Sequence, residues 1–150
     1  MAMSKSEHED VAEEAKTPEH REKARGKRIL IVEDDRLSMT LLSDFLNAHS
    51  YRVLKTGEGL EAINLARDEQ PDLILMDIRL PNISGFDVTR VLKQDNRTKA
   101  IPIIAVTAFA TPGDETTALE SGCAAYITKP VKVDELLRII RSFLSACLPQ

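Results

Sequence analysis

Five short stretches of apolar residues punctuate the chain after residue 27. Four of them are unbroken and lie at residues 29–32, 73–76, 101–106 and 124–127. Unbroken apolar runs of this length are typical of strands that are buried on both faces, as in a parallel sheet. Charged residues interrupt the fifth stretch, at 51–56, and this pattern favours a strand at the edge of the sheet. The chain is therefore expected to contain five strands.

Apolar residues at helical spacing follow four of these stretches. The stripes are Leu41, Leu42, Phe45 and Leu46; Leu60, Ile63 and Ala66; Val88, Val91 and Leu92; and Val133, Leu136, Leu137, Ile140, Phe143 and Leu144. A fifth, weaker helix is expected between Thr111, a cap ahead of Pro112 at the first position, and Gly122, which ends it. Asp35 is a candidate N-cap for the first helix. Strands and helices thus alternate five times.

This alternation predicts an α/β fold. Repeated βα units build a parallel sheet with right-handed crossovers and helices on both faces, here a doubly wound five-stranded (βα)5 arrangement. With the second strand at the edge, the expected strand order is 2-1-3-4-5, as in flavodoxin-like folds. In such folds, ligands bind beyond the carboxyl ends of the strands, where strands 1 and 3 are neighbours.

The first 26 residues differ in composition from the rest. They are rich in Glu, Lys, Ala and His and contain few large apolar residues, so they bury too little surface to offset the entropy of ordering. Ala, Glu and Lys also favour a solvated helix. We expect residues 1–26 to form a polar extension that is mostly disordered or frayed, and residues 27–150 to form one domain.

Composition excludes several classes of protein. The 150 residues are 43% hydrophobic, which suits one domain with a sizeable core. A net charge of -4 without a basic stripe argues against a nucleic-acid partner. No stretch approaches the roughly 20 apolar residues of a membrane helix, and no signal peptide is apparent. Cys123 and Cys147 lie outside any metal-binding spacing and are expected to be structural thiols in a reducing cytoplasm.

Polar residues follow the carboxyl ends of four predicted strands. They are Glu33, Asp34 and Asp35 after the first strand, Asp77 after the third, Thr107 after the fourth, and Lys129 with Pro130 after the fifth. Each alone has an ordinary explanation as a helix cap, a turn residue or a surface charge, and we accept a cap for Asp35. Their joint placement at one edge of the sheet favours a site.

The chemistry of this set points to phosphoryl transfer. Two carboxylates about 4 Å apart repel by on the order of 4 kcal/mol, and a hard divalent cation such as Mg²⁺ removes that repulsion. Lys129 adds a positive charge and Thr107 a hydroxyl donor. Aspartate is a competent nucleophile, and phosphoryl transfer mainly requires positioning and neutralisation of charge. Asp77 is therefore the candidate phosphoacceptor.

The chain resembles the receiver domain of two-component response regulators over about residues 27–144. The motifs that carry the resemblance are Val32-Glu33-Asp34-Asp35, Met76-Asp77-Ile78-Arg79-Leu80-Pro81, Ala105-Val106-Thr107-Ala108 and Tyr126-Ile127-Thr128-Lys129-Pro130. The stretches LILMDIRLPNISG, IPIIAVTAFA and GCAAYITKP are most similar to DivK-like single-domain regulators of cell division in alphaproteobacteria. The resemblance implies that residues 27–150 form a receiver domain.

The resemblance also implies a role for each site residue. Asp77 would accept the phosphoryl group from a histidine of a partner kinase or phosphotransfer protein. Asp34 would bind Mg²⁺ directly, Glu33 through water, and Arg79 through its backbone carbonyl. Lys129 would pair with Asp77 and then with its phosphoryl group. The peptide bond between Lys129 and Pro130 is expected to be cis.

Four further positions are implied to form the switch and its partner-binding face, namely Tyr126, Phe109, Ala108 and Pro130. Thr107 would move to bond a phosphoryl oxygen, and Tyr126 would turn inward to fill the space it leaves. Phe109 either screens the phosphoryl group from water or lines a partner-binding face; the residues alone favour neither.

The resemblance implies a signalling protein with no enzyme activity on other molecules. It would promote its own phosphorylation and dephosphorylation, and would signal through protein targets as a monomer or weak dimer. The first helix, with Leu37 and Met39, would dock the kinase, and the fourth and fifth helices would report the state. The implied location is the bacterial cytoplasm, with recruitment by partners to membrane kinases or a cell pole.

Three rival classes share parts of this pattern. A haloacid-dehalogenase-like phosphatase also uses a strand-end aspartate with Mg²⁺, but it needs a second aspartate two residues later, where this chain has Arg79. A receiver that binds partners without phosphorylation is disfavoured by the complete set of Asp34, Asp77, Thr107 and Lys129. A flavin-binding protein of this fold would need a phosphate loop rich in Ser, Thr and Gly after the first strand.

Overall fold

Five parallel strands form a single sheet in the computed structural model, which describes residues 26–108 and 111–145. The strands are β1 (Arg28–Val32), β2 (Arg52–Thr56), β3 (Leu73–Asp77), β4 (Ile103–Thr107) and β5 (Ala125–Thr128). Their order is β2-β1-β3-β4-β5, and every neighbouring pair is parallel. The predicted α/β fold and its strand order are confirmed.

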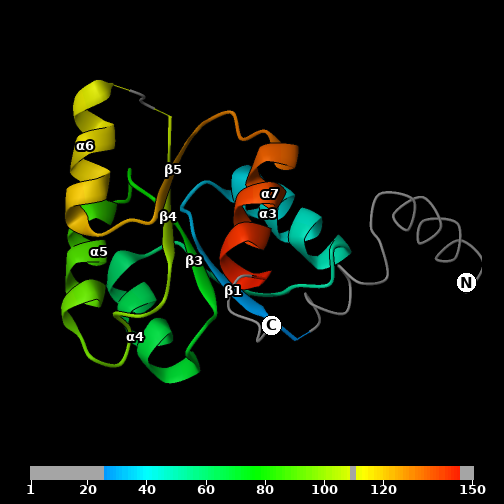
Figure 1. Cartoon of the computed structure of the whole chain (residues 1–150), viewed down its shortest axis with the longest axis horizontal. Helices are drawn as coiled ribbons and strands as arrows, with labels where there is room; N and C mark the ends of the chain where they lie inside the picture. The colour runs from blue at the N-terminus through cyan, green and yellow to red at the C-terminus, as the bar shows by residue number, and fades with distance from the viewer. Residues whose placement is uncertain (1–25, 109–110, 146–150) are drawn as a thin grey trace, which may run out of the picture.

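Five helices cover the two faces of this sheet. They are α3 (Arg36–Ala48), α4 (Gly59–Glu69), α5 (Gly85–Gln94), α6 (Pro112–Ser121) and α7 (Val133–Ser145). Helices α3 and α7 lie on one face, and α4, α5 and α6 lie on the other (Figure 1). Each face buries its own apolar cluster against the strands, as the alternation of βα units requires.

Burial along the strands explains their order. Every residue of β3 and β4 is buried, and so are four of the five residues of β1. Strand β2 lies at one edge of the sheet, and its Arg52 and Lys55 are exposed, as the interrupted pattern predicts. Strand β4 begins at Ile103 rather than at residue 101, because Pro102 has no N–H to donate to the sheet.

The caps expected from the sequence are present. The Asp35 carboxylate accepts the N–H of Ser38 at 2.8 Å at the start of α3. Thr111 caps α6 ahead of Pro112, and Gly122 ends α6 in the left-handed region with a φ of 113°. These three predictions are confirmed. The caps mark the start of α3 and both ends of α6.

Four apolar residues of the predicted helix stripes do not reach the core. Leu41, Leu60, Val91 and Val133 are exposed. Each helix packs on the sheet along one face, so the outermost apolar residue of a stripe remains in contact with solvent.

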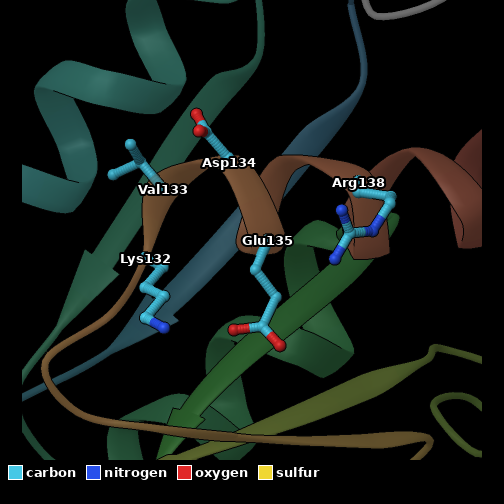
Figure 2. A pocket seen from close by; sticks show the side chains of 5 residues that line it. All are labelled: Lys132, Val133, Asp134, Glu135 and Arg138. Atoms are coloured by element: carbon cyan, nitrogen blue, oxygen red, sulfur yellow. The ribbon is translucent and has the colours of Figure 1, made fainter.

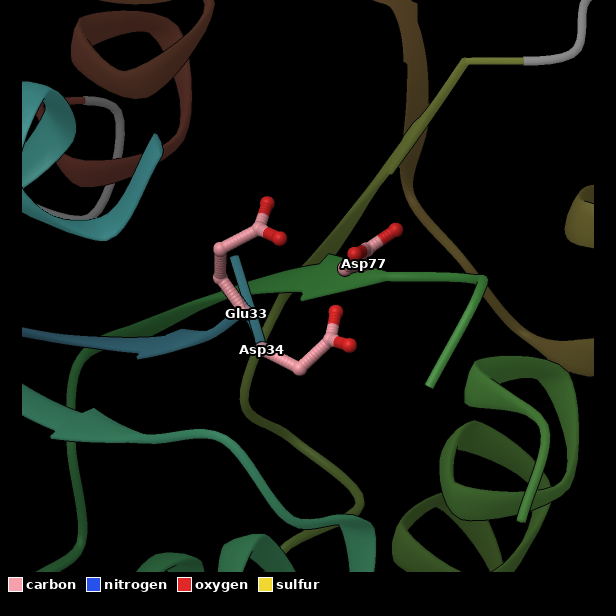
Figure 3. Close-up of side chains that lie close together, drawn as sticks. All are labelled: Glu33, Asp34 and Asp77. Atoms are coloured by element: carbon pink, nitrogen blue, oxygen red, sulfur yellow. The ribbon is translucent and has the colours of Figure 1, made fainter. Parts of the chain in front are cut away.

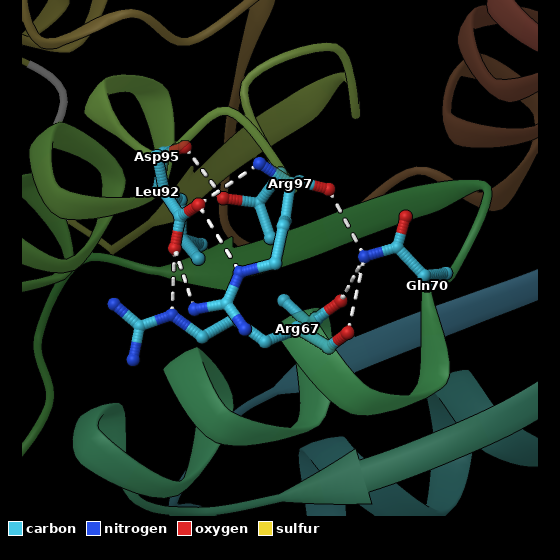
Figure 4. Close-up of polar contacts among 7 residues, drawn as sticks. Arg67, Gln70, Leu92, Asp95 and Arg97 are labelled. Atoms are coloured by element: carbon cyan, nitrogen blue, oxygen red, sulfur yellow. Dashed lines mark hydrogen bonds and ion pairs between the residues drawn. The ribbon is translucent and has the colours of Figure 1, made fainter.

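A polar network ties two connections together at the amino ends of the strands (Figure 4). Arg67 near the end of α4 donates from Nε to Asp95 Oδ2 at 2.7 Å, and the N–H of Arg97 donates to Asp95 Oδ1 at 2.8 Å. Gln70 donates to the carbonyl of Arg97 at 3.0 Å. The N–H of Arg97, with Arg67, lowers the pKa of Asp95 to about 2. The network thus links the end of α4 to the connection between α5 and β4, at the side of the sheet opposite the strands' carboxyl ends.

Three remaining expectations concern membrane helices, the N-terminal extension and the two cysteines. None of the described helices combines the length and apolar character that crossing a bilayer requires. Residues 1–25 of the predicted extension, together with Phe109 and Cys147, lie outside the described residues. Cys123 is buried and is a free thiol.

Candidate functional site

Three carboxylates meet at the carboxyl ends of β1 and β3. Glu33 and Asp34 directly follow β1, and Asp77 is the last residue of β3. The two strands are neighbours, with Val32 opposite Met76. Carboxylate oxygens of the three residues lie within 4.8 Å of one another (Figure 3). Glu33 and Asp77 are each 4% exposed, and Asp34 is open to solvent.

Backbone hydrogen bonds hold the two buried carboxylates in place. The N–H of Glu33 donates to the carbonyl of Thr56 at 3.0 Å, which extends the pairing of β1 with β2. The Glu33 carboxylate accepts the N–H of Asp35 at 3.0 Å. Asp77 Oδ1 accepts the N–H of Arg79 at 3.1 Å. The acidic cluster is therefore anchored by the chain that enters and leaves it.

Lys129 brings a positive charge to this cluster from the end of β5. Its Nζ lies 2.7 Å from Glu33 Oε1 and 3.6 Å from Asp77 Oδ2. Its backbone N–H donates to the carbonyl of Thr107 at 2.7 Å. The peptide bond between Lys129 and Pro130 is cis, as the resemblance implied. Sequence reasoning missed the contact with Glu33, because it paired Lys129 with Asp77 alone.

The electrostatics of the cluster are unbalanced. Burial, together with hydrogen bonding to Glu33 and the negative charge of Glu33, raises the pKa of Asp77 to about 7, against the opposing effects of the Arg79 N–H and Lys129. Burial lowers the pKa of Lys129, but the hydrogen bond to Glu33 and the charges of Asp77 and Glu33 outweigh it, so the pKa lies above its ordinary value. Lys129 thus contacts two of the three carboxylates.

The other predicted site residues lie around this cluster. Thr107 is buried at the end of β4, and the exposed Arg79 follows β3; both line a depression of about 400 Å³. Ala108 and Pro130 line a separate, mainly apolar pocket of about 620 Å³ beside α3. Tyr126 in β5 is half-buried against the core on the α4–α6 face. Phe109 lies outside the described residues.

Gly85 fits tightly beneath Asp77. A Cβ at Gly85 would lie 2.4 Å from the Asp77 carbonyl oxygen and 2.8 Å from the Ile78 Cα. The Gly85 N–H donates to the Ile78 carbonyl at 3.0 Å. The sequence shows that Gly85 closes the stretch LILMDIRLPNISG, but it does not show the close approach of α5 to the Asp77 backbone. The available signal was a glycine in the first turn of a helix, where it is otherwise unfavourable.

The acidic cluster suits a hard divalent cation. Its donors are carboxylate oxygens at short mutual distances, and Mg²⁺ prefers oxygen ligands and is commonly held by one or two carboxylates together with phosphate. Burial and the neighbouring Glu33 raise the pKa of Asp77, so its ionised carboxylate would be stabilised by a nearby cation. Glu33, Asp34 and Asp77 therefore fit Mg²⁺ better than any other group of metal-binding side chains in the described part of the chain.

A second depression, at the start of α7, does not share these features (Figure 2). It has a volume of about 540 Å³ and is lined by Lys132, Val133, Asp134, Glu135 and Arg138. Its charged groups have both signs and come from the first turns of α7 and the residue before it. We assign no site to it.

Comparisons with known proteins agree with this geometry. The response regulator receiver domain family matches residues 29–141. The polar-differentiation response regulator DivK of Brucella anthropi is 50% identical over 118 residues, which are 79% of this chain and 96% of the relative. DivK of Brucella abortus has the same identity and coverage.

Solved receiver domains have the same fold. The receiver domain of the sensor histidine kinase PA1611 from Pseudomonas aeruginosa, solved with a magnesium ion coordinated in its active site cleft, is 37% identical with a TM-score of 0.75, covering 80% of this chain and 98% of that one. The receiver domain of a histidine kinase from Syntrophus aciditrophicus is 31% identical with a TM-score of 0.77, covering 83% and 95%. Fold, motifs and relatives agree, and the chain belongs to the family of response regulator receiver domains.

Proposed function

We propose that Asp77 accepts a phosphoryl group from a phosphohistidine of a partner protein in a Mg²⁺-dependent reaction. The observation that supports the proposal is that two carboxylates from the end of β1 and a lysine from the end of β5 meet at the buried carboxylate of Asp77. The receiver-domain relatives support the same assignment. The protein is then a phosphorelay component that is switched by its own modification.

The residues present can carry this transfer. An Asp77 carboxylate oxygen forms a bond to phosphorus as the bond between phosphorus and the histidine nitrogen breaks, and that nitrogen keeps the electron pair. Asp34 and Asp77, with the carbonyl of Arg79, would hold Mg²⁺, and Glu33 would contribute through water. The bound cation would neutralise charge on the carboxylates and the phosphoryl oxygens. Lys129 supplies a second positive charge at the same place.

The modification would then be read by residues around the site. A hydroxyl at Thr107 can bond a phosphoryl oxygen, and Tyr126 would follow it inward. Ala108 and Pro130 line the apolar pocket beside α3. The shape of this pocket would therefore change when the loops after β4 and β5 move. For Phe109, which lies outside the described residues, the prediction stays that it either slows the loss of the phosphoryl group to water or contacts a partner. The protein would promote that hydrolysis as well as its own phosphorylation.

The exposed apolar residues of α3 and the relatives of this chain both support the proposed partners. Leu37 and Leu41 on α3 are exposed, and Leu41 also lines the apolar pocket, which would dock a histidine kinase or a histidine phosphotransfer protein. Downstream protein targets would bind the face of α6, β5 and α7. The role that we propose is control of cell division in the bacterial cytoplasm, with recruitment to a cell pole by partners; the Brucella relatives are named polar-differentiation response regulators, which supports the link to a cell pole.

Labelling with a small phosphodonor tests the proposal. Incubation with acetyl phosphate and Mg²⁺ should add one phosphoryl group to the intact protein, and the adduct should be labile to base. Asp77→Asn should take up none, whereas Asp87→Asn, at an exposed position on α5, should be labelled like the wild type. Labelling that persists in Asp77→Asn contradicts the assignment.

The same assay separates the rival classes. Repeated turnover of phosphomonoesters would favour a phosphatase. No labelling with any donor would favour a receiver that binds its partners without phosphorylation.

A further inference from the structure

Lys129 contacts two carboxylates, and the two contacts are unequal. Its Nζ lies 2.7 Å from Glu33 Oε1 but 3.6 Å from Asp77 Oδ2. A separation of about 2.7–2.9 Å is that of a charge-assisted hydrogen bond, whereas about 3.6 Å is too long for a hydrogen bond. Lys129 is therefore bonded to Glu33 and attracts Asp77 only across a gap.

Glu33 is held in the orientation that this bond needs. Its side chain is 2% exposed. Its second carboxylate oxygen accepts the N–H of Asp35 at 3.0 Å, and its own N–H donates to the carbonyl of Thr56 at 3.0 Å. If the Glu33 carboxylate turned away, the Lys129 ammonium and the Asp35 N–H would both lose their hydrogen-bond acceptor in a partly buried place. Such a loss is unfavourable. Both oxygens of Glu33 thus have protein partners before any cation binds.

We propose that Glu33 is a positioning residue for Lys129, an inference that rests on the proposed function. Glu33 holds the ammonium group beside Asp77 without letting it bond Asp77, so Asp77 Oδ2 stays accessible to an incoming phosphoryl group. After transfer, the new phosphoryl oxygens carry more negative charge than Glu33. Lys129 then leaves Glu33 for these oxygens, and the freed Glu33 carboxylate stays bonded to the N–H of Asp35.

A competing role for Glu33 makes a different prediction. If Glu33 served only the cation, through water, its replacement would weaken Mg²⁺ binding, and enough Mg²⁺ would restore the rate. If Glu33 positions Lys129, Glu33→Gln removes the charge that holds the ammonium, which then bonds Asp77 and blocks the oxygen that must react. Added Mg²⁺ does not restore that geometry.

The first experiment measures the phosphorylation rate by acetyl phosphate against Mg²⁺ concentration. We expect Glu33→Gln to be about tenfold slower than the wild type at saturating Mg²⁺, because loss of a hydrogen bond between charged groups shifts an equilibrium by about tenfold. Glu58→Gln is the matched control, since Glu58 is exposed after β2 and makes no side-chain cap bond; its rate should equal that of the wild type. A wild-type rate for Glu33→Gln at saturating Mg²⁺ would overturn the proposal.

The second experiment needs neither metal nor phosphoryl group. Urea unfolding in EDTA is measured for the wild type, Glu33→Gln, Lys129→Met and the double variant. We expect the two substitutions to be coupled by about fivefold or more in the unfolding equilibrium constant. Additive effects would overturn the proposal. A wild type that cannot be labelled would instead refute the proposed function, and the metal-free coupling would still report whether Glu33 holds Lys129.

Discussion

At the scale of single residues, Asp77 combines burial with an excess of negative charge. Its carboxyl group lies in the interior beside Glu33, and Lys129 is 3.6 Å away. The resulting rise of its pKa to about 7 means that the folded protein holds a proton on Asp77 more tightly than the unfolded chain does. The residue that we assign as phosphoacceptor is therefore also a source of instability when no cation is bound.

The sign of this effect gives a prediction for stability. The unfolded carboxyl loses its proton near pH 4 and the folded one near pH 7, so metal-free wild type should lose stability as pH rises between them. Asp77→Asn removes this titration. In EDTA at pH 8, we expect it to be more stable than the wild type by about 2 kcal/mol, with the gain shrinking towards pH 4, as measured by urea unfolding.

Two controls accompany this measurement. Asp44→Asn, at an exposed position on α3, should change stability by less than about 0.5 kcal/mol. Addition of Mg²⁺ should stabilise the wild type more than Asp77→Asn, because binding to the folded state is linked to its stability. A wild type that is more stable than Asp77→Asn at pH 8 in EDTA would contradict this account of the site.

Among the helices and strands, the packing of α4 and α5 positions the loop of residues 78–84 that follows β3. A Cβ at Gly59, the first residue of α4, would lie 2.5 Å from Ile83 and 2.8 Å from Val88. Gly85 allows α5 to approach the backbone of Asp77 in the same way. Because of these two glycines, the first turns of α4 and α5 can pack closely against the loop that contains Arg79. The position of Asp77 therefore depends on how these helices pack.

Gly85→Ala tests that dependence. The added methyl group would meet backbone atoms of Asp77 and Ile78, which cannot move without shifting the end of β3. We expect a loss of about 2 kcal/mol in the free energy of unfolding, together with slower labelling by acetyl phosphate.

Gly113→Ala is the matched control, because the nearest atom to its Cβ is 3.9 Å away on Thr111. This helical position should be unaffected or slightly stabilised. Equal effects of the two substitutions would show that Gly85 has no special packing role.

At the scale of the whole molecule, the fold follows from patterns that the sequence displays directly. Unbroken apolar runs identified the three central strands, but also β5, which lies at the second edge with only Ile127 buried. Arg52 and Lys55 identified the edge at β2, because a strand between two layers of helices cannot leave charges unpaired. The convergence of Asp34, Asp77 and Lys129 follows from the same topology, since parallel strands end at one edge.

The details that the sequence did not predict are those set by distances between side chains. The preference of Lys129 for Glu33 over Asp77 depends on a difference of 0.9 Å, from 2.7 to 3.6 Å, and strand order does not specify that difference. The exposure of Leu41 and Leu60 depends on how each helix is rotated on the sheet, which helical spacing defines only approximately.

Chemical mapping identifies the residue that carries the phosphoryl group, which we expect to be Asp77. The protein is phosphorylated with acetyl phosphate and Mg²⁺, reduced with borohydride, which converts an acyl phosphate to an alcohol, and digested with trypsin. The peptide of residues 68–79 contains Asp68, Asp72 and Asp77, so fragmentation distinguishes the acceptor from two internal controls. We predict homoserine at position 77 with Asp68 and Asp72 unchanged; homoserine at another acidic position, with Asp77 intact, would contradict the account.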